Sequence, residues 1–259
     1  MAAPYDRKPL LDPSTRRRGI YILPNLFTTA ALFAGFFAIV QAMNGNFEQS
    51  AVAIFVAMVM DGLDGRVARM TRTQSAFGAE YDSLSDMVSF GVAPALVVYV
   101  WALKGMGKLG WIAAFVYCAA AALRLARFNT QLEVADKRYF QGLPSPAAAA
   151  LLAGLVWVMH DHHISGESVR WLVWFVTLFA GLSMVSNLRY YSGKDINLRR
   201  SVPFMALLLL VLFFILISLD PPQVLCGLFV IYALSGYVLA LWNLRKPNAR
   251  KPPPEEQAP

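Results

Sequence analysis

Long apolar runs dominate the sequence, and each is close to the roughly 20 residues that a helix needs to cross a lipid bilayer. Hydrophobic residues make up 57% of the chain and charged residues only 15%, too few charges for a large soluble domain. We therefore predict an all-α, polytopic membrane protein with about eight transmembrane helices. The eight runs cover residues 23–42, 50–70, 81–103, 110–128, 145–162, 169–186, 202–219 and 223–243.

Lysine and arginine are distributed unevenly between the loops that join these runs. With the N-terminus in the cytoplasm and the runs alternating in direction, 20 of the 23 basic residues lie on the cytoplasmic side. The outer side then holds only Lys104, Lys108 and Arg170. Because cytoplasmic loops of membrane proteins are enriched in Lys and Arg, we predict an even number of spans with both termini in the cytoplasm. The net charge of +7 then anchors loops against anionic lipid, and we expect no nucleic-acid partner.

The two ends of the chain differ from its apolar middle. Residues 1–22 are predicted to be a cytoplasmic tail, in which the basic stretch 14–22 forms a short amphipathic segment at the membrane interface. Residues 23–243 form the predicted transmembrane domain. Residues 244–259 combine Pro and charge without an apolar face, so they are predicted to be a disordered cytoplasmic tail.

Four aspartates interrupt the second and third runs near their cytoplasmic ends. Asp61 and Asp64 are three residues apart, so they lie on one face of their helix. Asp82 and Asp86 are four apart, with the same consequence. The short connection makes the two helices antiparallel neighbours, and the four carboxylates then converge on one polar pocket. Because ionised carboxylates are costly in a membrane helix and usually mark function, the pattern predicts a functional site at the cytoplasmic surface.

Two interpretations of these aspartates follow from their chemistry. Hard cations such as Mg²⁺ and Mn²⁺ take carboxylate oxygens and often bridge them to substrate phosphates. Two such ions held close together stabilise both the attacking and the leaving oxygen of a phosphoryl displacement. Alternatively, the aspartates pair with Arg66, Arg69 and Arg72 in a charge network at the interface. We favour the metal site, because four acids lie on two convergent faces with small residues between them.

One stretch resembles the signature of the CDP-alcohol phosphotransferases at every defined position: Asp61-x-x-Asp64-Gly65-x-x-Ala68-Arg69, then, after eight residues, Gly78-x-x-x-Asp82-x-x-x-Asp86. The resemblance implies a core of six transmembrane helices, so that two of the eight are additions, and usually a homodimer. It implies two divalent metal ions, Mg²⁺ or Mn²⁺, on the four aspartates, with Asp86 also acting as the general base. It further implies that the CDP site is lined by Gly65, Ala68, Arg69 and Gly78.

Other stretches resemble the bacterial phosphatidylserine synthase subgroup: residues 23–28, 89–94, 123–129 and 140–147. The implied reaction transfers the phosphatidyl group of CDP-diacylglycerol to the hydroxyl of L-serine and releases CMP, at the cytoplasmic face of a bacterial inner membrane. Within the first stretch, Asn25 and Thr28 are predicted either to contact the nucleotide or to cap the helix. Sister transferases that use glycerol-3-phosphate or inositol phosphate remain an alternative, although their phosphate would need a denser basic pocket. A cation transporter is a third reading, which the gathering of the acids at one membrane face disfavours.

Four polar residues near the fourth and fifth runs are candidates for binding serine. Arg124 and Arg127 lie three apart at the cytoplasmic end of the fourth run, and a guanidinium binds a carboxylate through two parallel hydrogen bonds. Both arginines also suit the simpler role of positively charged anchors at a helix end. Asn129 and Ser145 are predicted either to add hydrogen bonds to serine or to cap their helices.

Overall fold

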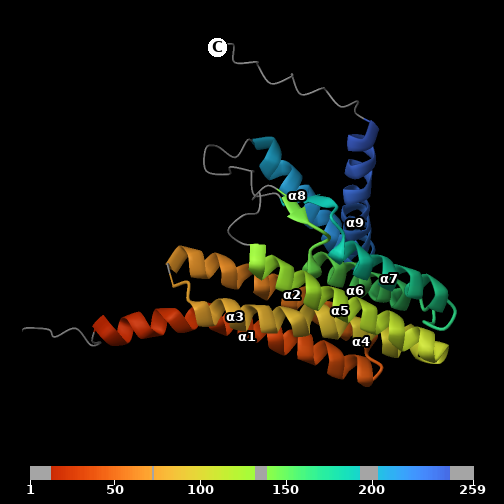
Figure 1. The fold of residues 1–259 in the computed structure, drawn as a ribbon, viewed down its shortest axis with the longest axis horizontal. Coiled ribbons are helices and arrows are strands. Elements are labelled where there is room, and N and C mark those ends of the chain that lie inside the picture. The colour runs from red at the N-terminus through yellow and green to blue at the C-terminus, as the bar shows by residue number, and fades with distance from the viewer. Residues whose placement is uncertain (1–12, 72, 132–138, 193–203, 246–259) are drawn as a thin grey trace, which may run out of the picture.

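The computed structural model describes residues 13–71, 73–131, 139–192 and 204–245, and helices predominate in this part of the chain (Figure 1). The α-helices are α1 (Pro13–Met43), α2 (Phe47–Thr71), α3 (Ala76–Asp86), α4 (Ala93–Val98), α5 (Lys108–Gln131), α6 (Ser145–Asp161), α7 (Arg170–Val185), α8 (Phe204–Leu219) and α9 (Pro221–Arg245). Three further segments join α3 and α4 into one continuous rod that ends at Met106: the π-helical η1 (Met87–Val92) and η2 (Tyr99–Leu103), and the 3₁₀ turn η3 (Lys104–Met106). A helix therefore covers most of each range predicted to span the membrane.

Four of the described helical stretches are long and apolar enough to cross a membrane: Leu23–Met43, Ala76–Met106, Lys108–Thr130 and Pro221–Trp242. The chain is thus a mostly helical protein with several candidate membrane spans, as its sequence predicts. The helices α6, α7 and α8 have 17, 16 and 16 residues and are shorter than those four, so the count of eight spans stays a prediction. Residues 13–22 form the first turns of α1. Most of the two predicted tails, residues 1–12 and 246–259, lies outside the described residues.

The helices gather around α6. α1 packs along α2, α5 packs on α7, and α6 contacts α2, α7 and α9. Figure 1 shows α1 to α7 side by side in one bundle, whereas α9 leaves the bundle at a steep angle with α8 beside it. Residues 147–156 of α6 are all buried, and half of them are Ala. Because small side chains let helices approach closely in a membrane, α6 can form the centre of the core.

A proline explains the first π-helical segment of the rod. Pro94 has no amide hydrogen, so the carbonyl of Phe90, four residues earlier, loses its α-helical donor. The hydroxyl of Tyr117 on α5 donates to that carbonyl at 3.0 Å, and both side chains are fully buried. The wide turn begins directly after Asp86, and turns of this kind are frequent at functional sites. The rod is therefore tied to α5 close to one of the four aspartates.

A short β-ribbon departs from the all-α prediction. β1 (Tyr139–Gln141) and β2 (Arg189–Tyr191) pair antiparallel, with Phe140 opposite Tyr190. The fully buried Tyr190 ring lies against Gly236 of α9, where an added Cβ would overlap it, and the Tyr190 hydroxyl donates to a carbonyl of α9 at 3.0 Å. The ribbon therefore fastens the segments before α6 and after α7 to α9. Strands of three residues have too few positions for an alternating pattern, so the apolar runs gave no sign of them.

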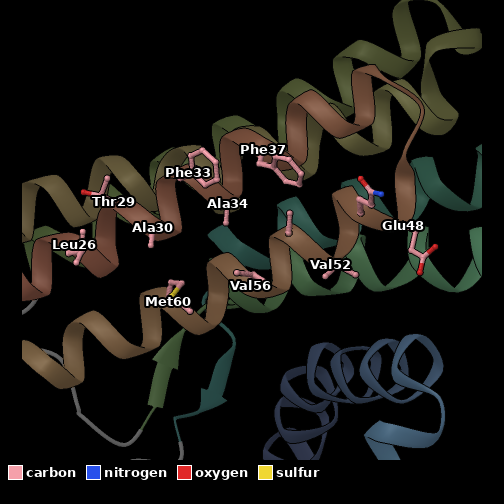
Figure 2. A pocket seen from close by; sticks show the side chains of 12 residues that line it. Leu26, Thr29, Ala30, Phe33, Ala34, Phe37, Glu48, Val52, Val56 and Met60 are labelled. Atoms are coloured by element: carbon pink, nitrogen blue, oxygen red, sulfur yellow. The ribbon is translucent and has the colours of Figure 1, made fainter.

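A groove of about 880 Å³ follows the seam between α1 and α2 (Figure 2). Its walls are mostly apolar, with Phe33 of α1 and Val56 of α2 near the middle. One end lies at Met60, directly before Asp61, and the other end lies at Glu48. The groove therefore begins beside the aspartates and runs toward the opposite end of the two helices.

Candidate functional site

The structure brings together the aspartates of α2 and α3. Asp61, Asp64 and Asp82 each offer a carboxylate oxygen, and these three oxygens lie within 4.8 Å of one another. Asp86 lies one turn beyond Asp82 on the same helix, and its carboxylate is within hydrogen-bonding reach of Asp61. Carboxylates in such contact repel one another unless they share a proton or a cation. The convergence expected from the spacing of the four acids is therefore found in the fold.

Local structure around the α2–α3 link holds this arrangement. Ser75 is the N-cap of α3, and its side-chain oxygen accepts a hydrogen bond from the amide of Gly78 at 3.0 Å. The hydroxyls of Thr71 and Thr73 are hydrogen-bonded at 2.7 Å across the end of α2. α1 packs against both α2 and α3 and so keeps the two aspartate helices side by side.

Thr28 of α1 contacts the acid cluster directly. It is buried, and its hydroxyl donates to a carboxylate oxygen of Asp64 at 2.8 Å. The Thr28 carbonyl in turn accepts a hydrogen bond from the Ser85 hydroxyl of α3 at 3.1 Å. Thr28 therefore orients Asp64 and links all three helices. It lies inside α1 and so is not the predicted cap, and its predicted contact with the nucleotide stays a prediction.

The remaining residues of the predicted CDP site lie around the same end of the helices. A Cβ added at Gly78 would lie 3.4 Å from the side-chain oxygen of Asn25, so α1 and α3 meet closely there. On α2, Gly65 and Ala68 are half-buried, whereas Arg69 is exposed. A terminal nitrogen of Arg69 lies 4.0 Å from the place that a Cβ on Gly65 would take. Asn25 therefore joins the signature residues spatially, and CDP binding by this group stays a prediction.

Arg124 of α5 supplies a buried cation beside the acids. Its side chain is only 9% exposed, and a terminal nitrogen donates to the hydroxyl of Ser145 at 2.7 Å. The guanidinium interacts electrostatically with Asp86 and Asp61. Its Nε atom is buried and has no hydrogen-bond partner. The Arg124 guanidinium therefore lies near the two acids and keeps one N–H donor without a partner, while Ser145 accepts a hydrogen bond from its terminal nitrogen.

Arg127 and Asn129 have other partners. Arg127 donates to the carbonyls of Val185 and Ser186 at 3.3 and 3.5 Å, which lie at the end of α7. Carbonyls at a helix C-terminus attract cations, which explains why Arg127 turns away from Arg124. Asn129 donates to the Ser83 hydroxyl at 3.0 Å. The structure thus unites Arg124 with Ser145 but not with Arg127, and Asn129 connects α5 to α3.

The residues at this site fit a divalent metal. The cluster offers oxygen ligands alone, which Mg²⁺ and Mn²⁺ prefer. One carboxylate oxygen of Asp82 is buried without a hydrogen-bond partner, as expected of an oxygen that a cation would bind. A surface charge network explains the cluster less well, because Asp64 is buried while Arg66 and Arg69 are exposed. Arg72, the third arginine of that alternative, lies outside the described residues.

Comparison with known proteins places these residues in context. Residues 21–182 match a family model described as CDP-alcohol phosphatidyltransferase. The chain is 35% identical over 223 residues to a CDP-diacylglycerol–serine O-phosphatidyltransferase of Helicobacter pylori, covering 86% of this chain and 93% of the relative. It is 39% identical over 171 residues to a protein of the same name from Mycobacterium tuberculosis, covering 63% of this chain and 58% of that relative. All four aspartates, Arg124 and Ser145 fall inside the matched family region.

Proposed function

The chain belongs to the CDP-alcohol phosphatidyltransferase family, and we propose that it is a CDP-diacylglycerol–serine O-phosphatidyltransferase. It transfers the phosphatidyl group of CDP-diacylglycerol to the hydroxyl of L-serine and releases CMP. The observation that carries this proposal is the buried Arg124 beside a cluster of four carboxylates. A metal-dependent phosphoryl site and a cation for an amino-acid carboxylate therefore adjoin each other. The similarity to the Helicobacter relative over most of both chains supports the same reaction.

The donor side of the site consists of the acids and the ends of α1, α2 and α3. Asp61, Asp64, Asp82 and Asp86 would hold two ions, Mg²⁺ or Mn²⁺, which when bound neutralise the charge of the donor's diphosphate. Asn25 and Gly78 border the space that we assign to CDP, together with Gly65, Ala68 and Arg69. The apolar groove that begins at Met60 suits a fatty acyl chain of a membrane-dissolved donor.

The acceptor side of the site is formed by α5 and the start of α6. The Arg124 guanidinium binds the carboxylate of serine, since its fork of N–H donors matches two carboxylate oxygens. Asp86 accepts the proton of the serine hydroxyl. The hydroxyl oxygen then attacks the phosphorus next to diacylglycerol, the bond from that phosphorus to the CMP oxygen breaks, and CMP leaves. Holding hydroxyl and phosphorus at attacking distance supplies much of the rate gain.

An acceptor assay tests this function. Purified protein with CDP-diacylglycerol and Mn²⁺ is offered labelled serine, glycerol-3-phosphate or inositol phosphate separately, and CMP and labelled lipid are measured. We expect labelled lipid from serine alone. In Arg124→Gln, the KM for serine should rise roughly 10- to 100-fold while the KM for CDP-diacylglycerol stays unchanged, because a charge-assisted hydrogen bond to the acceptor is lost. Transfer to a phosphorylated acceptor in place of serine would reject the proposed function.

We also propose that the acids face the cytoplasm of a bacterial cell, with eight spans and both termini inside. The 20-to-3 division of basic residues supports this orientation. After replacement of both native cysteines, a membrane-impermeant thiol reagent should label Lys104→Cys from outside and Gln74→Cys only after the inner face is exposed. Both positions are exposed in the fold, and the reverse pattern would overturn the orientation.

The homodimer implied by the family resemblance is tested by the mass of the solubilised protein.

A further inference from the structure

One face of α5 is fitted against the rod that carries Asp86. Tyr117, Ala121 and Arg124 lie at positions i, i+4 and i+7, which share a helical face. The Tyr117 hydroxyl donates to the Phe90 carbonyl of η1, and Arg124 interacts with Asp86 at the end of α3. The groups assigned to the serine carboxylate and to its hydroxyl proton therefore sit on two helices that touch along this face.

Next to the Tyr117 contact, the helices meet at a glycine. A Cβ added at Gly91 of η1 would lie 3.2 Å from the Cβ of Ala121 and 3.0 Å from the end of the Met87 side chain. Met87 is flexible and can move aside, but the Ala121 Cβ is fixed to the backbone of α5. A larger residue at position 91 must therefore push α5 and η1 apart by a few tenths of an ångström.

The π-helical turn connects the contact between Gly91 and Ala121 to Asp86. The turn begins directly after Asp86, and its free carbonyl at Phe90 is held by Tyr117. Close packing at Gly91 and the Tyr117 hydrogen bond thus set the position of the rod relative to α5. Because Arg124 lies on the same face of α5, they also set the separation between its guanidinium and the Asp86 carboxylate.

We propose that the contact between Gly91 and Ala121 determines which length of amino-acid acceptor the enzyme accepts. This inference rests on the proposed function. The acceptor must reach Arg124 with its carboxylate and Asp86 with its hydroxyl at the same time. Serine has one methylene between its α-carbon and its hydroxyl, and homoserine has two. A wider separation of the two helices should therefore favour homoserine over serine, and Gly91 and Ala121 act as positioning residues.

The test compares serine and homoserine in Gly91→Ala. The kcat/KM for serine should fall about fivefold, since misplacement of a reacting group by 1 Å can cost roughly 10²-fold and the shift here is a few tenths of an ångström. The ratio of kcat/KM for homoserine to that for serine should rise at least about fivefold, and the KM for CDP-diacylglycerol should stay within about twofold of wild type. A general loss of packing would lower both acceptors together and leave the ratio unchanged.

Two further variants make the comparison specific. Gly227→Ala in α9 adds a methyl group that meets nothing within 4 Å. For this variant, the ratio of kcat/KM for homoserine to that for serine should equal the wild-type ratio. In Gly91→Ala/Ala121→Gly, the opposing methyl group is removed, and the ratio should return toward the wild-type value. If Gly91→Ala does not accumulate, Ala121→Ser enlarges the same contact from α5, and the same rise in ratio is expected.

The outcomes separate this inference from the proposed function. An active wild-type enzyme whose acceptor ratio does not change in Gly91→Ala or Ala121→Ser overturns the inference alone. An equal change in Gly227→Ala also overturns it, because that glycine is remote from the contact. A wild-type enzyme that releases no CMP in response to serine overturns the proposed function and the inference with it.

Discussion

Replacement of Asp61, Asp64 or Asp82 by Asn is expected to reduce phosphatidyl transfer by at least about a thousandfold while the protein still folds. Each of these side chains gives one oxygen to the cluster within 4.8 Å. An amide in place of a carboxylate removes negative charge that a hard divalent ion needs among its ligands. CMP release with CDP-diacylglycerol and serine, measured over a range of Mn²⁺ concentrations, checks this result. EDTA should abolish the same activity in the wild-type protein.

An exposed acid at the far end of α6 provides the control for these variants. Asp161→Asn changes the net charge equally but lies away from the cluster, so it should keep wild-type activity. Thermal unfolding in the absence of metal distinguishes a lost ligand from a lost fold. Because removal of one carboxylate relieves repulsion among the others, the three variants should melt at or above the wild-type temperature. Full activity in EDTA would contradict the metal site.

Asp86→Asn is expected to lower kcat by roughly 10²–10⁴-fold while CDP-diacylglycerol still binds at saturating Mn²⁺. Serine's hydroxyl is a poor nucleophile near neutral pH, and a positioned proton acceptor contributes about this much to such a reaction. Asp86 lies outside the group of three acids whose oxygens are mutually closest. Its loss should therefore weaken metal binding less than the loss of Asp82.

The comparison between Asp86→Asn and Asp82→Asn decides the role of Asp86. Donor affinity and rate are measured for both variants at saturating Mn²⁺. For Asp82→Asn, we expect donor affinity and rate to fall together, as for a metal ligand. If the two quantities also fall together for Asp86→Asn, then Asp86 is a metal ligand first and the base lies elsewhere.

The sequence predicts the helices and the acid cluster because both depend on local rules. Runs of apolar residues report helices directly, and spacing of three or four residues places side chains on one helical face whatever the packing. The convergence of the acids needed only the additional premise of a short connection between α2 and α3. Both rules depend on few residues at a time, which is why the fold agrees with them.

Arg127 shows that sequence spacing alone does not predict the direction in which a long side chain points. Arg124 and Arg127 have the same spacing as Asp61 and Asp64, yet only Arg124 turns toward the acids. Arg127 finds carbonyl partners at the end of α7, a helix more than 40 residues further along the chain. Long side chains can reach several neighbours, so their direction depends on which helix packs beside them. That neighbour is a property of the tertiary fold.

The hydrogen bonds that Thr28 and Tyr117 make to other helices escaped prediction for a related reason. Each donates a hydroxyl to a group on another helix: Thr28 to Asp64, 36 residues away, and Tyr117 to Phe90, 27 residues away. Pro94 was the available signal for the second contact, since a proline within an apolar run leaves one carbonyl without its donor. No feature of the sequence says which side chain will satisfy that carbonyl.

The hydrogen bond between Tyr190 and α9 has a consequence for the order in which the protein folds during translation. The carbonyl that receives the Tyr190 hydroxyl belongs to Ala233, which is synthesised 43 residues later. The helices that carry the aspartates and Arg124 are therefore all translated well before the ribbon can be anchored. During this interval Tyr190 has no partner on α9, and a chain released before Ala233 would never gain one. Synthesis of the last helix is thus the step that allows the ribbon of the nascent enzyme to be anchored.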